Sequence, residues 1–358
     1  MATETQYTHV ELLTLTGPEY RRVSTAPPRL PTEDEIPIID LNPIDGDFQE
    51  RKDLASKIRA AAENTGFFYV KNHGIPEDLI QEALSQAKAF FHQPEEGKQK
   101  VASAKMKQMD GFHGVGSTQI NKTESKDQKE TFSLRYNPLR DPQANPTTLP
   151  ADDPDNALWE GTAHLPGFRE TTIAFYQARL NLARKMIRIF ALALNLPEDY
   201  FDDLVTHPGA DGLYVHYPGT PDAANRSDAE LDVGIGSHTD IQCVTLLWQD
   251  MSGGLQVLST NDEWLDARPI PGTLVVNIGD FLQRLSNNRF RSTVHRVYNR
   301  QSTSRYSMPF FLGFNPESVC QVVPSCVDDE HPPLYKPISC GQWHRDRLAL
   351  AQGLLVRP

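Results

Sequence analysis

GSHTDIQCVTLLWQD, residues 236 to 250, begins with an imidazole and a carboxylate two positions apart and continues as an apolar run typical of a buried strand. On a strand, side chains two positions apart project to the same face, so the sequence predicts that His238 and Asp240 stand side by side. Polar groups on a buried face need a partner that compensates their lost hydration. This pair is therefore the first candidate for a functional site.

The strands that would surround this pair follow one another closely. From Leu213 onward the apolar pattern has a period of two, and turn residues such as Ser252, Gly253 and Gly254 separate the runs. The expected strands are LYVHY (213–217), HTDIQCVTLLW (238–248), GLQVLS (254–259), WLDA (264–267), TLVVNIG (273–279), STVHRVY (292–298) and RYSMPFFLGF (305–314). This pattern indicates an antiparallel sandwich or barrel.

The segment before these strands mixes helices and strands. IPIIDL (36–41) and FFYVKN (67–72) are expected strands, and residues 51–64 and 75–94 are expected helices, with Gly66 suited to the first helix end. The apolar positions 173, 176, 180, 183, 187, 190 and 194 form one stripe, which predicts a long scaffold helix, with a coiled coil as the alternative. Residues 95–165 are expected to be mostly loop, with a possible strand at 130–136.

The chain is expected to form one integrated unit of four parts. These are a loosely held polar arm (1–35), an α/β region with the scaffold helix (36–205), a strand-rich core (206–320) and a C-terminal helix that could act as a lid (321–358). The fold class is thus an all-β core with helical additions. Within 358 residues such a unit can bury a large hydrophobic core.

Composition and charge exclude several classes of partner. The 35 basic and 47 acidic residues give a net charge of −12, and no run of Lys and Arg could follow a phosphate backbone. No stretch approaches the roughly 18 apolar residues of a membrane span. We therefore expect a cytoplasmic protein with no nucleic-acid or membrane partner, while the oligomeric state is not indicated. The four cysteines have no CxxC spacing and are expected to be free thiols.

A third polar residue of the right kind lies on a later core strand. His295, in STVHRVY, is separated from Asp240 by the 54 residues 241–294, which contain hairpin-forming segments that could return it to the first strand. Two imidazoles and one carboxylate on one face of an octahedral ion leave three positions for other ligands, the arrangement of non-haem Fe(II) oxygenases. Taken alone, H-x-D is a weak motif, and a histidine on a strand is more often a core or surface residue.

A second polar pair occurs in RYSMPFF (305–311). Arg305 and Ser307 share one strand face within a mostly apolar run. A buried guanidinium needs an anion, and the neighbouring hydroxyl could add a hydrogen bond to a carboxylate. The alternative is a structural ion pair with one of the acidic residues of the chain.

As a set, the motifs are highly specific. NTGFFYVKNHGIP (64–76), HYP (216–218), HTD (238–240), GGLQV (253–257), NIGDFLQRLSNNRFRSTVHRV (277–297) and RYSMPFF make the chain resemble the isopenicillin N synthase-like branch of the 2-oxoglutarate and Fe(II)-dependent dioxygenase superfamily. The resemblance covers most of the chain. It implies a double-stranded β-helix (jelly roll) with N-terminal helices, and Fe(II), 2-oxoglutarate and O2 as cofactor and cosubstrates.

The resemblance also implies a role for individual residues. His238, Asp240 and His295 would be the iron ligands, and Arg305, Ser307 and Tyr217 would hold the distal carboxylate of 2-oxoglutarate. One departure is Val215, where several plant members have Asn, so one polar contact to the cosubstrate is missing. Phe112, His113, Tyr214 and the C-terminal helix are candidates for the substrate wall, with ordinary packing as the alternative for each.

The implied function is oxidation of an unactivated C–H bond of a small molecule, with hydroxylation, desaturation, cyclisation or ring expansion all open, in specialised metabolism or nucleobase oxidation. The main alternative is an Fe(II) oxidase of isopenicillin N synthase type that uses no 2-oxoglutarate. A remote alternative is a catalytically inert ligand-binding barrel. Zinc hydrolysis on the same triad lacks an identified general base.

Overall fold

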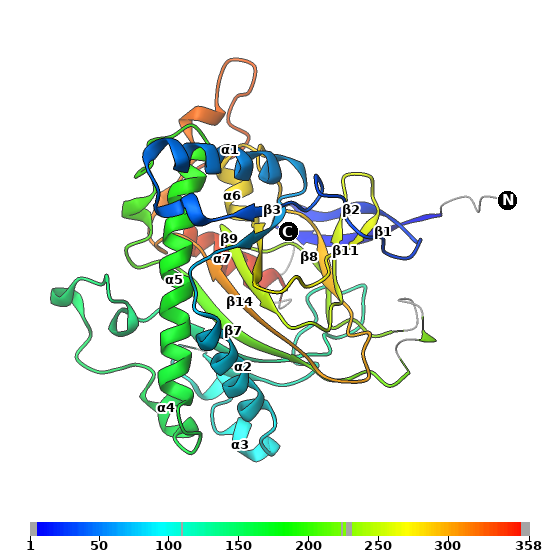
Figure 1. Cartoon of the computed structure of the whole chain (residues 1–358), viewed down its shortest axis with the longest axis vertical. Coiled ribbons are helices and arrows are strands. Elements are labelled where there is room, and N and C mark those ends of the chain that lie inside the picture. Colours follow the sequence, from blue (N-terminus) through cyan, green and yellow to red (C-terminus); the bar gives the residue numbers. More distant parts are fainter. Residues whose placement is uncertain (1–5, 109, 223–224, 227–230, 352–358) are drawn as a thin grey trace.

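Two sheets that face each other form the centre of the computed structural model, which describes residues 6–108, 110–222, 225–226 and 231–351 (Figure 1). The larger sheet has the order β3 (Ile38–Asp40), β4 (Phe67–Lys71), β12 (Thr273–Ile278), β9 (Val244–Gln249), β14 (Arg305–Leu312), β7 (Ala210–Tyr217), β6 (Glu130–Arg135), β5 (Gly111–His113). The smaller sheet has the order β11 (Trp264–Asp266), β10 (Leu255–Leu258), β13 (His295–Val297), β8 (Ile235–His238). Their pairings are antiparallel except for β3 with β4.

Successive strands of the core change sheet. The chain passes from β7 in the larger sheet to β8 in the smaller, back to β9, across to β10 and β11, back to β12, across to β13 and back to β14. This alternation winds the chain as the double-stranded β-helix that the resemblance implied, so the expected fold class is confirmed. It also turns the inner faces of β7 and β14 toward β8 and β13.

The described part of the chain also forms helices, several of which cover the outer face of the larger sheet. The helices are α1 (Phe48–Asn64), α2 (Glu77–Phe91), α3 (Glu95–Gln99), α4 (Asn156–Thr162), α5 (Phe168–Ala193), α6 (Asp280–Leu285) and α7 (Cys340–Ala351). Figure 1 shows α5 running along the molecule beside α2, and α1 crossing near its end. The predicted stripe on α5 is buried against β14, so it is a scaffold helix. Among the described residues, no helix has the length and apolarity needed to span a membrane.

Apolar side chains fill the two interfaces that this layering creates. Between the helices and the larger sheet, the core includes Phe90, Phe132, Phe168, Ile187 and Phe190, all almost completely buried. A smaller cluster between the sheets contains Val215, Tyr217, Val257, Val275 and Val297. The larger sheet is therefore buried on both faces, which explains why its central strands read as nearly continuous apolar runs.

The polar N-terminal arm is more ordered than the sequence suggested. Strands β1 (Tyr7–Thr14) and β2 (Gly17–Ser24) form an antiparallel hairpin. Val10, Leu12 and Val23 of this hairpin pack with Trp264 and Val294 of the core. The prediction of a loosely held arm was wrong because alternate residues of β1 are apolar and bury one face of the hairpin.

Residues 236–250, which begin with the His238 and Asp240 pair, do not form a single strand. Strand β8 ends at His238, residues 239–243 belong to no strand, and β9 begins at Val244 in the other sheet. The backbone N–H of Asp280 donates to the carbonyl oxygen of Asp240 at 2.7 Å, and that of Gly279 donates to the carbonyl oxygen of Cys243 at 2.9 Å. Hydrogen bonds from the start of α6 therefore stabilise a crossover, where we had expected a continuous strand.

The scaffold helix is joined to the chain after β6 by a buried ion pair. Arg184 of α5 donates from both terminal nitrogens to the two oxygens of Asp141, at 2.8 and 2.6 Å. Burial raises the pKa of Asp141, but the hydrogen bonds from Arg184 and from the Gln143 backbone N–H outweigh it, so its pKa is below the ordinary value. Tyr136 donates a further hydrogen bond to this carboxylate.

We expect Asp141→Asn to lower the free energy of unfolding by about 3 kcal/mol at pH 7, because it leaves the Arg184 guanidinium buried without its counter-ion. Because the folded-state pKa of Asp141 is depressed, its contribution is complete above the unfolded value of about 3.9 and disappears as the pH falls through the folded value. Urea unfolding of both proteins between pH 7 and pH 3 measures this. A difference that grows as the pH falls would contradict the assignment.

Candidate metal centre

Three groups that can bind a metal converge between the two sheets. His238 ends β8, His295 begins β13, and the two residues are directly paired across these strands. The Nε2 atoms of His238 and His295 lie 3.6 and 3.7 Å from the same oxygen, Oδ1 of Asp240. The three ligand atoms lie within 4.8 Å of one another. In the described part of the chain, these residues form a cluster that could bind a metal ion. The structure thus brings together the three residues singled out in the sequence.

Hydrogen bonds fix which ring nitrogen faces this point. Nδ1 of His238 lies 2.7 Å from the carbonyl oxygen of Gly236, and Nδ1 of His295 lies 3.1 Å from that of Thr293. A carbonyl only accepts, so each Nδ1 carries the proton and each Nε2 presents a lone pair. Burial, together with the nearby His238 ring, lowers the pKa of His295 to about 4, which keeps this ring neutral near pH 7.

The carboxylate of Asp240 is oriented through its second oxygen. Oδ2 accepts hydrogen bonds from the Thr245 hydroxyl and, at 2.7 Å, from Nδ2 of Asn277. Burial opposes ionisation of Asp240, but the electrostatic effect of the two neighbouring imidazoles and the hydrogen bond from Asn277 outweigh it and lower its pKa. Asp240 is thus an ionised carboxylate that offers one oxygen, Oδ1, to a metal.

The three side chains are arranged to bind a divalent cation and not to form hydrogen bonds with one another. Separations of 3.6 to 3.7 Å are too long for hydrogen bonds, so two lone pairs and an anionic oxygen face one another with no proton between them. Such an arrangement is repulsive unless a cation lies among the three atoms. Two imidazoles and one carboxylate on one side of the ion are the ligands of the 2-His-1-carboxylate facial triad.

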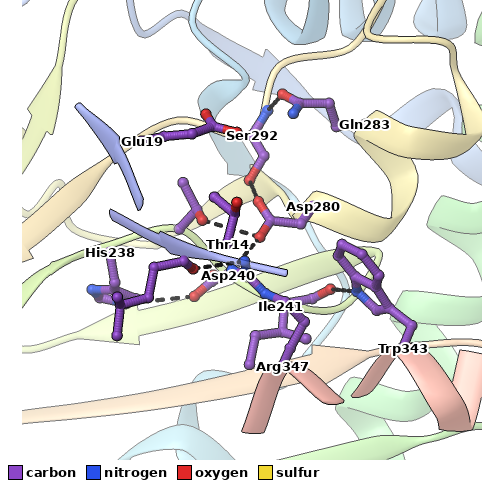
Figure 2. A network of polar contacts seen from close by, with 12 residues as sticks. Thr14, Glu19, His238, Asp240, Ile241, Asp280, Gln283, Ser292, Trp343 and Arg347 are labelled. Atoms are coloured by element: carbon purple, nitrogen blue, oxygen red, sulfur yellow. Dashed lines mark hydrogen bonds and ion pairs between the residues drawn. The ribbon is translucent and has the colours of Figure 1, made fainter. Parts of the chain in front are cut away.

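Asp280 connects the crossover to two other parts of the chain, the segment before His295 and the C-terminal helix. Its side chain accepts hydrogen bonds from Thr239 at 3.1 Å, from Ser292 at 2.7 Å and from Arg347 of α7 at 2.6 Å. Figure 2 shows Asp280 with Ser292 on one side and Arg347 below, next to Asp240. Thr239 lies between two metal-site residues and Ser292 precedes the third. The Asp280 carboxylate therefore holds the segments that carry all three metal-site residues.

The C-terminal helix binds the same crossover directly. Nε1 of Trp343 donates to the carbonyl oxygen of Ile241 at 2.9 Å, and Arg347 also donates to the carbonyl oxygen of Leu13 in β1 at 2.9 Å (Figure 2). Both ends of the chain are thus hydrogen bonded around the triad. His344 and Leu348 of the same helix line the cavity beside the triad. The continuation of the expected helix beyond Ala351 lies outside the described residues.

A second polar site lies on the inner face of β14. The side chain of Arg305 is 1% exposed; its Nε donates to the carbonyl oxygen of Gly253 at 2.6 Å and its Nη2 to Oε1 of Gln249 at 3.1 Å. Its Nη1 is buried without a hydrogen-bond partner, and no described carboxylate forms an ion pair with it. The predicted alternative, a structural ion pair, is therefore not found in the described part of the chain. The unpaired nitrogen fits a bound anion.

Ser307 and Tyr217 lie beside this guanidinium. In the pairing of β14 with β7, Arg305 is opposite Tyr217 and Ser307 is opposite Val215. The guanidinium carbon is 4.7 Å from the centre of the Tyr217 ring. All four side chains lie on the sheet face that looks toward the triad, and the hydroxyls of Ser307 and Tyr217 have no partner among the described residues. Arg305, Ser307 and Tyr217, which were expected to bind one carboxylate, therefore lie together on this face of the sheet.

The triad opens into a cavity of about 310 Å³. His113 lines this cavity, but Phe112 and Tyr214 do not. Those two side chains lie on the opposite face of the sheet, where they pack with Phe90 and Phe132 in the core. Because successive strand residues point to opposite faces, His113 and Leu213 face the cavity instead. The expectation that Phe112 and Tyr214 contact substrate is corrected accordingly.

Sequence reasoning also missed residues that support the site. Asn277 and Thr245 are polar residues inside the apolar strands TLVVNIG and VTLLW, and this contrast is the signal that could have identified them. Asp280 lies in NIGDFLQ directly after a buried strand. Nothing in the sequence pattern indicated Arg347, because its partners lie 67 and 334 positions away along the chain.

Two family comparisons match separate parts of the chain. Residues 36–156 match the family described as non-haem dioxygenase in morphine synthesis, N-terminal. Residues 211–314 match the 2OG-Fe(II) oxygenase superfamily. The second match includes the triad and the guanidinium site, and the first covers most of the helical region that precedes the core.

Individual proteins are similar over nearly the whole chain. The 2-oxoglutarate-Fe(II) type oxidoreductase ppzC of Metarhizium rileyi is 41% identical and covers 97% of both chains. The 1-aminocyclopropane-1-carboxylate oxidase of Dictyostelium discoideum is 31% identical over 82% of this chain and 85% of that protein. The crystal structure of a full-length Neurospora crassa protein in complex with alpha-KG and 5-formyluracil has a TM-score of 0.72 at 27% identity, and covers 91% of this chain and 100% of that chain.

We expect Arg347→Met to loosen the crossover, because it removes the hydrogen bonds to Asp280 and Leu13 while keeping the apolar stem of the side chain. Amide hydrogen exchange should become at least about fivefold faster in residues 239–243 and 340–351, which corresponds to about 1 kcal/mol of local stability. Arg345→Met, on the exposed side of the same helix, is the matched control. Equal exchange in the two variants would show that Arg347 does not brace the crossover.

Proposed function

The chain belongs to the 2-oxoglutarate–Fe(II) oxygenase superfamily and is a 2-oxoglutarate- and Fe(II)-dependent oxidoreductase, and from this premise we propose which residues form its site. His238, Asp240 and His295 bind Fe(II). Arg305 binds the distal carboxylate of 2-oxoglutarate, and Ser307 and Tyr217 donate hydrogen bonds to it. The observation that carries this assignment is the convergence of three unprotonated ligand atoms on one point.

The position of Arg305 supports the cosubstrate assignment. Its Nη1 is a buried donor without a partner, and a carboxylate is the group that a guanidinium binds most strongly. With Val215 in place of an amide, the hydroxyls of Ser307 and Tyr217 are the remaining donors on this face. The related Neurospora structure that contains alpha-KG supports the same choice of cosubstrate.

When bound at this site, Fe(II), 2-oxoglutarate and O2 supply the oxidant that removes hydrogen from a C–H bond. The protein contributes geometry and exclusion of water. His238, Asp240 and His295 occupy one side only, which leaves the other side to face the cavity. Leu213, Ile235 and Phe311 give this part of the cavity apolar walls. A substrate held there has one C–H bond close to the metal and little water around it.

The reaction we propose is oxidation of an unactivated C–H bond of a small molecule. A cavity of about 310 Å³ lies at the lower end of the range for small-molecule sites. The similarity to a fungal oxidoreductase over 97% of the chain supports a role in specialised metabolism. Hydroxylation, desaturation, cyclisation and ring expansion all begin with the same removal of hydrogen.

A second candidate function uses the same residues without 2-oxoglutarate. The similarity to an aminocyclopropane-carboxylate oxidase favours this alternative, because an oxidase of this kind could use Arg305 to hold a carboxylate of its substrate. The two functions differ in what the Arg305 site binds and agree on the metal ligands. Variants at the two sites therefore test them separately.

Asp240→Ala should lower Fe(II) affinity by more than about 100-fold and abolish iron-dependent turnover of 2-oxoglutarate, since it removes the only anionic ligand of the triad. The free energy of unfolding of the metal-free protein should fall by no more than about 3 kcal/mol, the cost of leaving Thr245 and Asn277 unpaired. Iron content, succinate formation and urea unfolding measure these effects. Full activity in the variant would refute the triad.

Arg305→Ala should raise the 2-oxoglutarate concentration needed for half-saturation by at least about tenfold, because one charge-assisted pair with the carboxylate is lost. Anaerobic titration of the Fe(II) protein, followed by the weak visible charge-transfer band of the chelate, measures this. Arg268→Ala, which removes an exposed arginine elsewhere, is the control. If iron binds and the wild type gives no band, the oxidase alternative replaces the proposal.

A further inference from the structure

Lys129 lines the same cavity as the metal-site residues His238 and Asp240, and the function proposed above does not use it. Its side chain is 13% exposed although it carries an ammonium group. It precedes β6, where Thr131, Ser133 and Arg135 alternate along the strand and all line the cavity. Lys129 continues this row by one step and lines the same cavity. A long cationic side chain thus lines the same cavity as His238.

The ammonium group is only partly neutralised by the protein. Its charge partner is Asp127, at 3.4 Å, and the pair forms no hydrogen bond in the described structure. Asp127 already accepts hydrogen bonds from the Thr118 hydroxyl at 2.7 Å and from the Gly236 backbone N–H at 3.2 Å. An ammonium has three donors, and burial makes unfilled donors on a charged group costly. The donors of Lys129 are therefore available to an anion in the cavity.

Arg135, the other cation of this wall, has a different environment. Its Nε lies 3.9 Å from carboxylate oxygens of both Asp110 and Asp211, and its side chain is 40% exposed. It lies where the cavity meets an outer cleft of about 900 Å³, which shares Arg135, Asp211 and His344 with it. Two carboxylates and solvent thus compensate the charge of Arg135. Lys129 is the cation that remains for a ligand inside the cavity.

The described acids that line this cavity are Asp211, which lies beside Arg135, and the metal-site residue Asp240. Burial lowers the pKa of His113, and the charges of Arg135 and Lys129 lower it further, so this ring is neutral between the two cations. Beyond these polar groups, the lining is mainly apolar: Ile120, Leu213, Ile235, Ile241, Phe311 and Leu348. The cavity thus combines one largely covered cation, Lys129, with apolar walls and the metal centre.

We propose that Lys129 binds a carboxylate of the substrate, so that the enzyme oxidises a small organic acid whose apolar body lies between Lys129 and the metal centre. This inference rests on the proposed function of the triad. Asp127 contacts both Lys129 and the backbone of Gly236, two residues before His238, so the anion site is fixed relative to the iron ligands. An acid held at one end presents a defined C–H bond to the metal at the other.

A carboxylate at Lys129 could belong to the substrate or to 2-oxoglutarate. In the register of β6 with β7, Lys129 is one step before the pair formed by Glu130 and His216, which places it across from Tyr217. Arg305 pairs with Tyr217 from the other side, on β14. The central strand β7 thus separates the two cations laterally, and each can hold its own carboxylate. Measuring both ligands in the same variants distinguishes the two sources.

The test uses phenylacetate and phenylacetamide as probes, because they have the same shape and differ in charge. Fe(II) protein saturated with 2-oxoglutarate under anaerobic conditions is titrated with each by calorimetry. Lys129→Met and Lys129→Gln are compared with Lys126→Met, which removes an exposed lysine three positions away. The variants are checked by thermal unfolding, and Lys129→Gln keeps a polar group beside Asp127 if Lys129→Met unfolds.

We expect the wild type and Lys126→Met to bind phenylacetate at least about tenfold more tightly than phenylacetamide, and both Lys129 variants to lose this preference. The affinity for 2-oxoglutarate should stay within about twofold. A wild type without the preference, or a Lys129 variant that keeps it, overturns the proposal. Weakened 2-oxoglutarate binding in the Lys129 variants assigns the carboxylate to the cosubstrate and also overturns it. A missing charge-transfer band contradicts the proposed metal centre, while the calorimetric comparison still decides the role of Lys129.

Discussion

The mutual repulsion of three lone-pair-bearing atoms in a dry interior is the constraint on which the rest of this structure depends. The Nε2 atoms of His238 and His295 and an oxygen of Asp240 face one point, and only a cation there makes this arrangement favourable. In the unfolded chain the three groups would move apart. The fold therefore has to hold them together through rigid elements, and each element contributes one part of that restraint.

The two sheets and the chain ends share this task. Strand pairing sets His238 opposite His295, while backbone hydrogen bonds from the start of α6 shape the crossover that carries Asp240. Asp280 then connects this crossover to the C-terminal helix through Arg347, which also reaches the N-terminal hairpin. Segments from both ends of the chain thus meet at the metal centre. The integrity of the site therefore depends on described segments that lie far apart in the sequence.

Two positively charged side chains, Arg305 and Lys129, lie at separate positions on one face of the larger sheet and are proposed to bind two different ligands. Arg305 on β14 and Lys129 before β6 lie on either side of β7. Arg305 is a buried cation with an unfilled donor, whereas Lys129 is a partly exposed cation that lines the cavity. Arg305 is surrounded by hydrogen-bonding groups, which suits a small dicarboxylate, whereas Lys129 adjoins a mainly apolar cavity, which suits an acid with an apolar body. The metal centre on the facing sheet can then serve both ligands at once.

The sequence by itself predicted a strand-rich core and the scaffold helix, because these depend on local periodicity. The double-stranded β-helix and the roles of the triad residues were implied by the resemblance that the set of motifs carries. The sequence also predicted that Arg305 and Ser307 share one face, because side chains two positions apart on a strand point to the same side. Only the tertiary structure decided how the triad is assembled. His238 and Asp240 meet through a crossover between sheets where the pattern predicted one continuous strand, because hydrogen bonds from the distant residues Gly279 and Asp280 shape the backbone there. The packing of Phe112 and Tyr214, the hairpin at the N-terminus and the contacts of Arg347 likewise depend on partners far away in the chain, which no local pattern specifies.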